Sequence, residues 1–254
     1  MRNLKLTVSY DGTRFVGWQR QGKGKSIQGL LEAAFMDLEG APCTVNGAGR
    51  TDAGVHASGQ VASVCVTLMH DVATIARALN AQLPKEIRVI AVEDVRSEFH
   101  ARFSAAKKTY RYLIFNGPVV GPFLNRFVWH IREPLNKTAM AIAARQLVGT
   151  HDFNVFKNAD HDPSTTIRTL LHSDISEAQA TLTDAHVQKL LMYEVSGDGF
   201  LHHMVRYLVG TMLEVARGRY TLRDFKNLLN NEETEAVVVR APAQGLFLKQ
   251  VIYD

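Results

Sequence analysis

The sequence predicts an α+β protein in which two similar units follow one another along the chain. Alternating apolar residues indicate strands, and apolar residues spaced three or four apart indicate helices. Both halves approximate the order strand–helix–strand–strand–helix–strand, which is the order of a ferredoxin-like unit. We therefore expect two ferredoxin-like units in tandem, residues 1–104 and residues 105–254, with their sheets side by side and a central cleft.

The first half begins with an alternation of apolar residues, from Leu4 through Leu6 and Val8 to Tyr10, which predicts a strand. Ser26 is suited to cap the helix that should follow. The other elements expected in this half are a strand near 43–46, a strand over 60–68, a helix over 72–83 and a strand over 87–92.

The second half begins with an alternating strand over residues 107–115. A polar loop is expected over 151–163, because that stretch has no apolar periodicity. The remaining elements expected are a helix over 135–147, strands near 167–175 and 190–195, helices over 200–216 and 221–229, and a closing strand over 246–253.

The composition is that of a soluble globular protein, with 46% hydrophobic and 21% charged residues among 254. No apolar run approaches the roughly 18 to 20 residues of a membrane span, and the N-terminus lacks a signal-peptide core. We expect a cytoplasmic protein in which Cys43 and Cys65 are reduced, buried thiols. The net charge of +4 is mild support for a polyanionic partner.

A stretch of small residues from Gly47 to Ala57 holds one carboxylate, Asp52, two residues after Arg50. Glycine and alanine leave room for a ligand beside the chain, and the following strand would anchor the loop. A guanidinium close to Asp52 would keep its carboxylate ionised at neutral pH. The alternative interpretation is an ordinary turn, in which the aspartate caps backbone amides.

A glycine-rich segment over residues 14–25 carries four cations, Arg14, Arg20, Lys23 and Lys25, with Phe15 and Trp18 among them. Its position between a strand and a helix invites a phosphate-loop interpretation, but both possible frames of that motif fail. A basic and aromatic loop suits a nucleic-acid backbone and its bases, and sheets of this RRM-like topology read RNA.

Histidines at position 56 and at positions 202 and 203 raise the question of a metal site. Adjacent histidines on a helix point apart, and no third ligand with suitable spacing follows. The spacing of these histidines therefore predicts no metal site. Arg206, on the helix expected over 200–216, falls between buried positions and reaches the helix surface.

A series of motifs resembles the TruA-type tRNA pseudouridine synthase family across nearly the whole chain. The most specific is Gly49-Arg50-Thr51-Asp52-Ala53-Gly54-Val55-His56-Ala57, which matches the family's catalytic signature. Other matching segments are 10–19, 99–105, 108–112, 149–153, 204–206 and 240–246, whereas residues 154–190 carry little of the family pattern.

The resemblance implies an isomerase that converts uridine to pseudouridine at nucleotides 38, 39 and 40 of the tRNA anticodon arm, without cofactor or metal, as a homodimer. It implies that Asp52 is the nucleophile, with Arg50 and Arg206 also catalytic and Arg206 paired with Asp52 across the cleft. It also implies that Tyr110 stacks on the target base. Tyr110, Leu246 and the four cations of the basic loop are the substrate-binding residues expected.

The residues are consistent with this chemistry, because a carboxylate can attack or stabilise the cationic sugar formed when a glycosidic bond breaks. The sequence leaves open whether Asp52 bonds to the sugar or drives an elimination. Taken alone, Tyr110 is also typical of a core aromatic on a strand, and Arg206 of an exposed helix residue. The alternative functions are a non-catalytic RNA-binding or chaperone protein and, less well supported, a small-molecule hydrolase.

Overall fold

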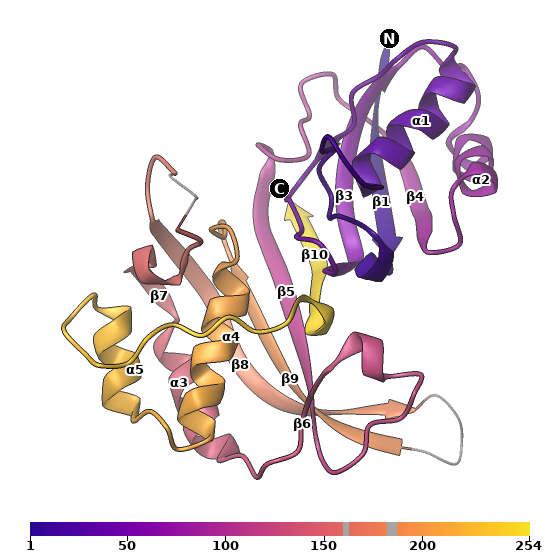
Figure 1. Cartoon of the computed structure of the whole chain (residues 1–254). Coiled ribbons are helices and arrows are strands. Elements are labelled where there is room, and N and C mark those ends of the chain that lie inside the picture. The colour runs from indigo at the N-terminus through magenta and orange to yellow at the C-terminus, as the bar shows by residue number, and fades with distance from the viewer. Residues whose placement is uncertain (160–162, 182–186) are drawn as a thin grey trace. The chain divides into compact units, whose positions relative to one another are not determined.

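A computed structural model describes residues 1–159, 163–181 and 187–254 and has a mixed α/β fold with a large sheet (Figure 1). The chain forms two compact units. The first contains residues 1–108 together with the C-terminal strand residues 247–254, and the second contains residues 109–246. Among the described residues, no helix is both long enough and apolar enough to cross a bilayer.

The sheet of the first unit has the strand order β4-β1-β3-β10, with a short strand β2 also paired to β3. Strand β1 pairs antiparallel with both neighbours, and Leu6 lies opposite Ala62 of β3. Strand β10 pairs parallel with β3, which places Phe247 opposite His56. The strands are β1 (Arg2–Tyr10), β2 (Asn46–Gly47), β3 (His56–Val66), β4 (Ile87–Val95) and β10 (Leu246–Tyr253).

Two helices, α1 (Ile27–Glu39) and α2 (Val72–Gln82), complete the first unit (Figure 1). Ser26 caps α1 by accepting a hydrogen bond from the N–H of Gly29, as expected from its sequence position. The predicted alternation of β1 is confirmed, because Leu4, Leu6, Val8 and Tyr10 are all buried. These side chains form the core with the buried faces of the helices, Ile27, Leu31, Ala34 and Phe35 of α1 and Ile75 and Leu79 of α2.

The sheet of the second unit has the strand order β5-β9-β8-β7, with β6 paired parallel to β5. Strands β8 and β9 form a long antiparallel ribbon in which Ile175 lies opposite Tyr193. The strands are β5 (Ala105–Asn116), which begins in the first unit, β6 (Trp129–Ile131), β7 (Gly149–Asp152), β8 (Ile167–Thr181) and β9 (Val187–Gly197).

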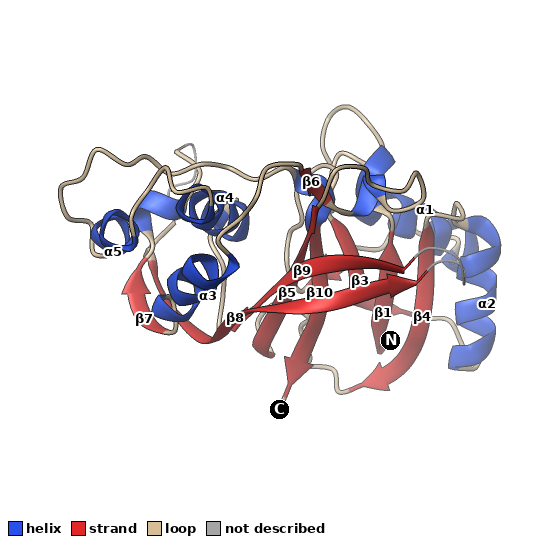
Figure 2. Ribbon diagram, turned by 90° about the horizontal axis from the view of Figure 1, so that it is seen from below, coloured by secondary structure: helices blue, strands red, loops and turns tan. Residues whose placement is uncertain are grey.

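Helices α3 (Lys137–Gln146), α4 (Met204–Ala216) and α5 (Leu222–Leu229) lie together on one side of β7 and β8 (Figure 2). Nearly every residue of α4 is buried, because its sequence is apolar on most of its circumference. Arg206 and Tyr207 are partly exposed. A capping box of Thr221 and Asp224 begins α5.

Several elements differ from the sequence-based expectation. The strand expected near 43–46 is reduced to β2, and β3 begins at His56, near the end of the stretch that contains Asp52. Helix α4 begins at Met204 rather than at residue 200, because His203 has a left-handed φ of 63° that interrupts helical geometry. Residues 149–152 form β7 at the start of the expected polar loop, of which residues 160–162 lie outside the described part of the chain.

The expectation of buried thiols is wrong. Both cysteines are free thiols, but Cys65 is exposed and Cys43 is half-buried. The apolar alternation of β3 placed Cys65 on the strand correctly, yet its side chain faces away from the core between the buried Val64 and Val66.

Candidate active site

Asp52 stands at the start of a tight turn that leads into β3. The N–H of Val55 donates to the carbonyl oxygen of Asp52 at 3.1 Å, and Gly54 has a φ of 78°. A turn that requires positive φ at its third residue favours glycine there. The chain therefore forms a turn here, as the local sequence predicts, and Asp52 is half-buried.

Two glycines from the segment after β1 pack against this turn. A Cβ atom on Gly12 would lie 1.9 Å from the carbonyl oxygen of Val55, and one on Gly17 would lie 2.5 Å from that of Thr51. Next to Gly17, the N–H of Trp18 donates to the Thr51 carbonyl at 3.0 Å. The segment 12–18 therefore supports the Asp52 turn. This role could not be seen in the sequence, because the two segments lie far apart along the chain.

His56 joins the end of the turn to the same segment. Its Nδ1 atom lies 3.0 Å from the backbone nitrogen of Gly12 and 3.2 Å from Oδ1 of Asp11. His56 Nδ1 can accept a hydrogen bond from the Gly12 N–H only when Nδ1 carries no proton. It can donate to Asp11 only when Nδ1 is protonated. Asp11 Oδ1 already accepts from the N–H and hydroxyl of Thr13, so we assign the bond to the Gly12 N–H. The His56 ring also stacks on Phe247 at 4.7 Å.

Arg50 does not fulfil the electrostatic role expected of it within the first unit. Its side chain is exposed, and no hydrogen bond or ion pair joins it to another described residue. The spacing of two residues between Arg50 and Asp52 therefore does not produce the ion pair that the sequence suggested.

The basic loop presents its cations to solvent but not its aromatic rings. Arg14, Arg20, Lys23 and Lys25 are exposed, and the first two pair with Glu86 at 3.2 Å and Glu32 at 3.7 Å. Phe15 and Trp18 are buried, and the Trp18 ring lies against Gly47. Both rings therefore pack inside the first unit and do not stand among the exposed cations, contrary to the expected basic and aromatic loop. Lys23 and Lys25 are exposed and form no ion pair with another described residue.

The site residues expected in the second unit lie on β5, on α4 and at the start of β10. Tyr110 is 7% exposed and contacts the edge of Phe200 at a ring distance of 4.9 Å. Arg206 donates from Nε to the carbonyl oxygen of Ala241 at 2.8 Å, and Leu246 is buried. The bond from Arg206 holds Ala241, at the start of the segment 241–246, against α4.

Tyr112, which the sequence analysis did not single out, supports the same segment. Its hydroxyl donates to the carbonyl oxygen of Pro242 at 2.8 Å, and its ring fills the space that a Cβ on Gly245 would need. Burial raises the pKa of Tyr112 well above its usual range, although the charge of Arg206 opposes that shift. The phenol therefore remains a neutral donor.

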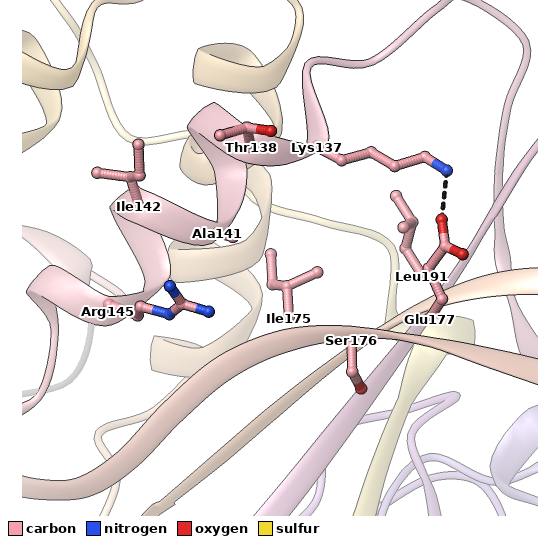
Figure 3. Close-up of a pocket in the computed structure, with 9 residues that line it drawn as sticks. All are labelled: Lys137, Thr138, Ala141, Ile142, Arg145, Ile175, Ser176, Glu177 and Leu191. Atoms are coloured by element: carbon pink, nitrogen blue, oxygen red, sulfur yellow. Dashed lines mark hydrogen bonds and ion pairs between the residues drawn. The ribbon is translucent and has the colours of Figure 1, made fainter.

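A pocket in the second unit lies between α3 and strands β8 and β9 (Figure 3). Its lining includes Lys137, which pairs with Glu177 at 2.7 Å, and Arg145, which pairs with Asp174 at 3.0 Å. The predicted site residues are not among those that line it. Because carboxylates already engage both cations, this pocket is poorly suited to a phosphate backbone.

Comparison with known proteins identifies the family. The sequence pattern of a family described as tRNA pseudouridine synthase matches residues 6–104 and 143–254. A tRNA pseudouridine synthase A from Roseiflexus castenholzii is 44% identical over 253 residues, which are 100% of this chain and 91% of that protein. Proteins of the same name from Pelobacter propionicus and Acetivibrio thermocellus are 38% and 36% identical, and each match covers 100% of both chains.

These matches define an enzyme of the isomerase class. The chain belongs to the tRNA pseudouridine synthase family. The Asp52 turn and the segment 204–246 lie inside the matched pattern, whereas Tyr110 lies between its two parts and within the alignment to the full-length relatives.

Proposed function

We propose that this protein isomerises uridine to pseudouridine in the anticodon arm of tRNA, at nucleotides 38, 39 and 40, with Asp52 as the nucleophile. Family membership supports pseudouridine chemistry on tRNA. The observation that carries the residue assignment is the Asp52 turn, whose half-buried carboxylate stands on a backbone held by Gly12, Gly17 and Trp18. Catalytic groups are typically placed on loops that a rigid scaffold positions.

The proposed reaction conserves every atom of the nucleotide. The bond between ribose C1′ and uracil N1 breaks, a bond between C1′ and C5 forms, C5 loses a proton and N1 gains one. Breaking the glycosidic bond places positive charge on C1′, and a carboxylate stabilises or attacks such a centre in glycosidases. Asp52 supplies this carboxylate, and the uracil returns to C1′ where a glycosidase would add water.

The target uridine has to leave its stack, which costs a few kcal/mol. Stacking on an aromatic ring returns about 1–3 kcal/mol per base. We assign this contact to Tyr110, and we assign Arg206 to act with Asp52 and Leu246 to bind the nucleotide. The exposed Arg50 would contact phosphates, as would the four cations of the basic loop, Arg14, Arg20, Lys23 and Lys25. All five side chains reach solvent, where a phosphate can approach them.

The proposal includes finer features of the fold and assembly. In the first unit, the order β4-β1-β3 with β2 on β3 and helices α1 and α2 between strands supports a ferredoxin-like assignment. We also propose that the unit is repeated in tandem, that the protein is a homodimer and that it is cytoplasmic. The support for these three features is the family resemblance.

A set of unmodified tRNA transcripts, each with uridine at a single position of the anticodon arm, tests the function. Pseudouridine is mapped at nucleotide resolution after incubation with the parent protein or with Asp52→Ala. We expect product at positions 38, 39 and 40 with the parent and none with the variant. Conversion only at other tRNA positions would refute the assignment of nucleotides 38, 39 and 40 as the targets. Binding of every transcript without any conversion would instead favour the non-catalytic RNA-binding alternative.

A further inference from the structure

A buried polar network holds the chain on both sides of Arg50, immediately before Asp52. The Tyr10 hydroxyl lies 2.7 Å from Oγ1 of Thr51, and both residues are buried. Gln60, which is also buried, donates from Nε2 to the carbonyl oxygen of Gly49 at 2.7 Å. The two anchors come from the ends of neighbouring strands, because Tyr10 ends β1 and Gln60 lies near the start of β3.

The amide of Gln60 fixes the direction of its own two contacts in the network. Gln60 Nε2 carries only donors, and it lies 3.5 Å from the Tyr10 oxygen, which accepts this long contact. Either hydroxyl can be the donor in the bond between Tyr10 and Thr51. Burial raises the pKa of Tyr10 to about 12, so the phenol keeps its proton at physiological pH.

Thr51 is consequently held through both its side chain and its main chain. Its hydroxyl meets Tyr10, and its carbonyl oxygen accepts from the N–H of Trp18 at 3.0 Å. With these two bonds in place, the peptide unit that leads into Asp52 cannot rotate without breaking one of them. Buried polar networks that are fully satisfied rigidify the segments that they join.

We propose that Tyr10 is a positioning residue for the isomerisation, which acts through Thr51 to fix the direction of the Asp52 carboxylate. This inference rests on the proposed role of Asp52. A displacement of about 1 Å at a reacting group can lower a rate about 100-fold, so a hydroxyl remote from the substrate can still control turnover. The effect should fall on kcat, because Tyr10 is buried and is not placed to bind RNA.

The competing interpretation is that Tyr10 is an ordinary core tyrosine, and the second unit supplies a matched control. The Tyr193 hydroxyl lies 3.0 Å from Oγ of Ser173, and both residues are buried. Burial also raises the pKa of Tyr193 above its usual value. Tyr193→Phe therefore removes one hydroxyl of a comparable buried pair, and no hydrogen bond that these two side chains form with described residues reaches the Asp52 turn.

The experiment compares Tyr10→Phe, Thr51→Val, Thr51→Ser and Tyr193→Phe in the full-length protein. For each we measure kcat and KM for pseudouridine formation on tRNA and the melting temperature. Tyr10→Phe and Thr51→Val should each lower kcat by about tenfold or more, while KM stays within about twofold. Thr51→Ser, which keeps the hydroxyl, should recover most of the parental kcat. Tyr193→Phe should lower the melting temperature and leave kcat unchanged.

The double variant Tyr10→Phe with Thr51→Val sharpens the test. Because both substitutions break one interaction, their effects on kcat should be far from multiplicative. Parental kcat in Tyr10→Phe, or a loss no larger than that of Tyr193→Phe, would overturn the inference. If Tyr10→Phe does not fold, the difference between Thr51→Ser and Thr51→Val decides. Parental activity in Asp52→Asn would refute the proposed function instead, so the two failures are distinguishable.

Discussion

A Cβ atom on Gly17 would lie 2.5 Å from the carbonyl oxygen of Thr51, and Gly17 has a φ of 104°. This contact joins the segment after β1 to the residue that precedes Asp52. Two features of Gly17 require glycine at this position. Other residues rarely adopt its φ, and every other residue carries a Cβ atom that would collide with the Thr51 carbonyl.

Gly17→Ala should therefore destabilise the protein and disturb the Asp52 turn. A residue forced into such a conformation costs about 1–3 kcal/mol, so the free energy of unfolding in denaturant should fall by about that amount and kcat should fall with it. Gly22 is the matched control in the same loop, because nothing lies within 4 Å of its Cβ position. A Gly17→Ala protein as stable and as active as Gly22→Ala would show that the contact is not required.

The bond between His56 and the Gly12 N–H makes a second prediction. His56→Leu leaves a buried N–H without an acceptor, which costs about 1–3 kcal/mol. His56→Asn has nearly the shape of leucine but places an oxygen where Nδ1 stood. Denaturant unfolding should therefore show His56→Asn to be clearly more stable than His56→Leu. Equal stability of the two variants would mean that the ring contributes only by packing on Phe247.

The exposed lysines of the basic loop should bind tRNA through phosphates. Replacement of Lys23 and Lys25 by glutamine should weaken tRNA binding and reduce the slope of log K against log salt by about 1 for each phosphate that the loop no longer binds. Lys137→Gln is the control, because that lysine is paired with Glu177 beside the pocket of the second unit. An unchanged salt slope in the Lys23 and Lys25 variants would remove the loop from the RNA-binding surface.

Tyr110 tests whether a phenol moves the proton that leaves uracil C5. Tyr110→Phe keeps a ring that can contact Phe200 and stack on a base, but it has no hydroxyl. If the phenol moves this proton, kcat should fall by about 10²–10⁴-fold while tRNA affinity is kept. Retention of the parental rate would limit Tyr110 to stacking, and Tyr110→Leu would then show the remaining effect of the ring.

Elements that depend on local periodicity could be predicted from the sequence, and those that depend on distant contacts could not. The alternation from Leu4 to Tyr10 identified β1 because one face of that strand is buried. Strands β6 and β7 were not predicted, since three or four residues are too few to show a period. The burial of Trp18 depends on Gly47, which lies far along the chain and leaves no local signal.

The candidate site shows the same division. The small-residue motif singled out Asp52, and its turn follows from Gly54. The supports of that turn, Tyr10, His56 and Gln60, come from positions whose local pattern indicates only strands. Arg50 was expected beside Asp52 because of its spacing, but its side chain is exposed and pairs with no other described residue.

The central claim is that the Asp52 carboxylate performs the chemistry. Its most direct test is the single-turnover rate of pseudouridine formation by Asp52→Asn at saturating enzyme, measured beside the dissociation constant for the same tRNA. Asparagine keeps the shape and removes the charge, so we predict no detectable product together with tRNA binding as tight as or tighter than that of the parent. A single-turnover rate within about twofold of the parental rate, well inside the loss expected for a nucleophile, would contradict the account.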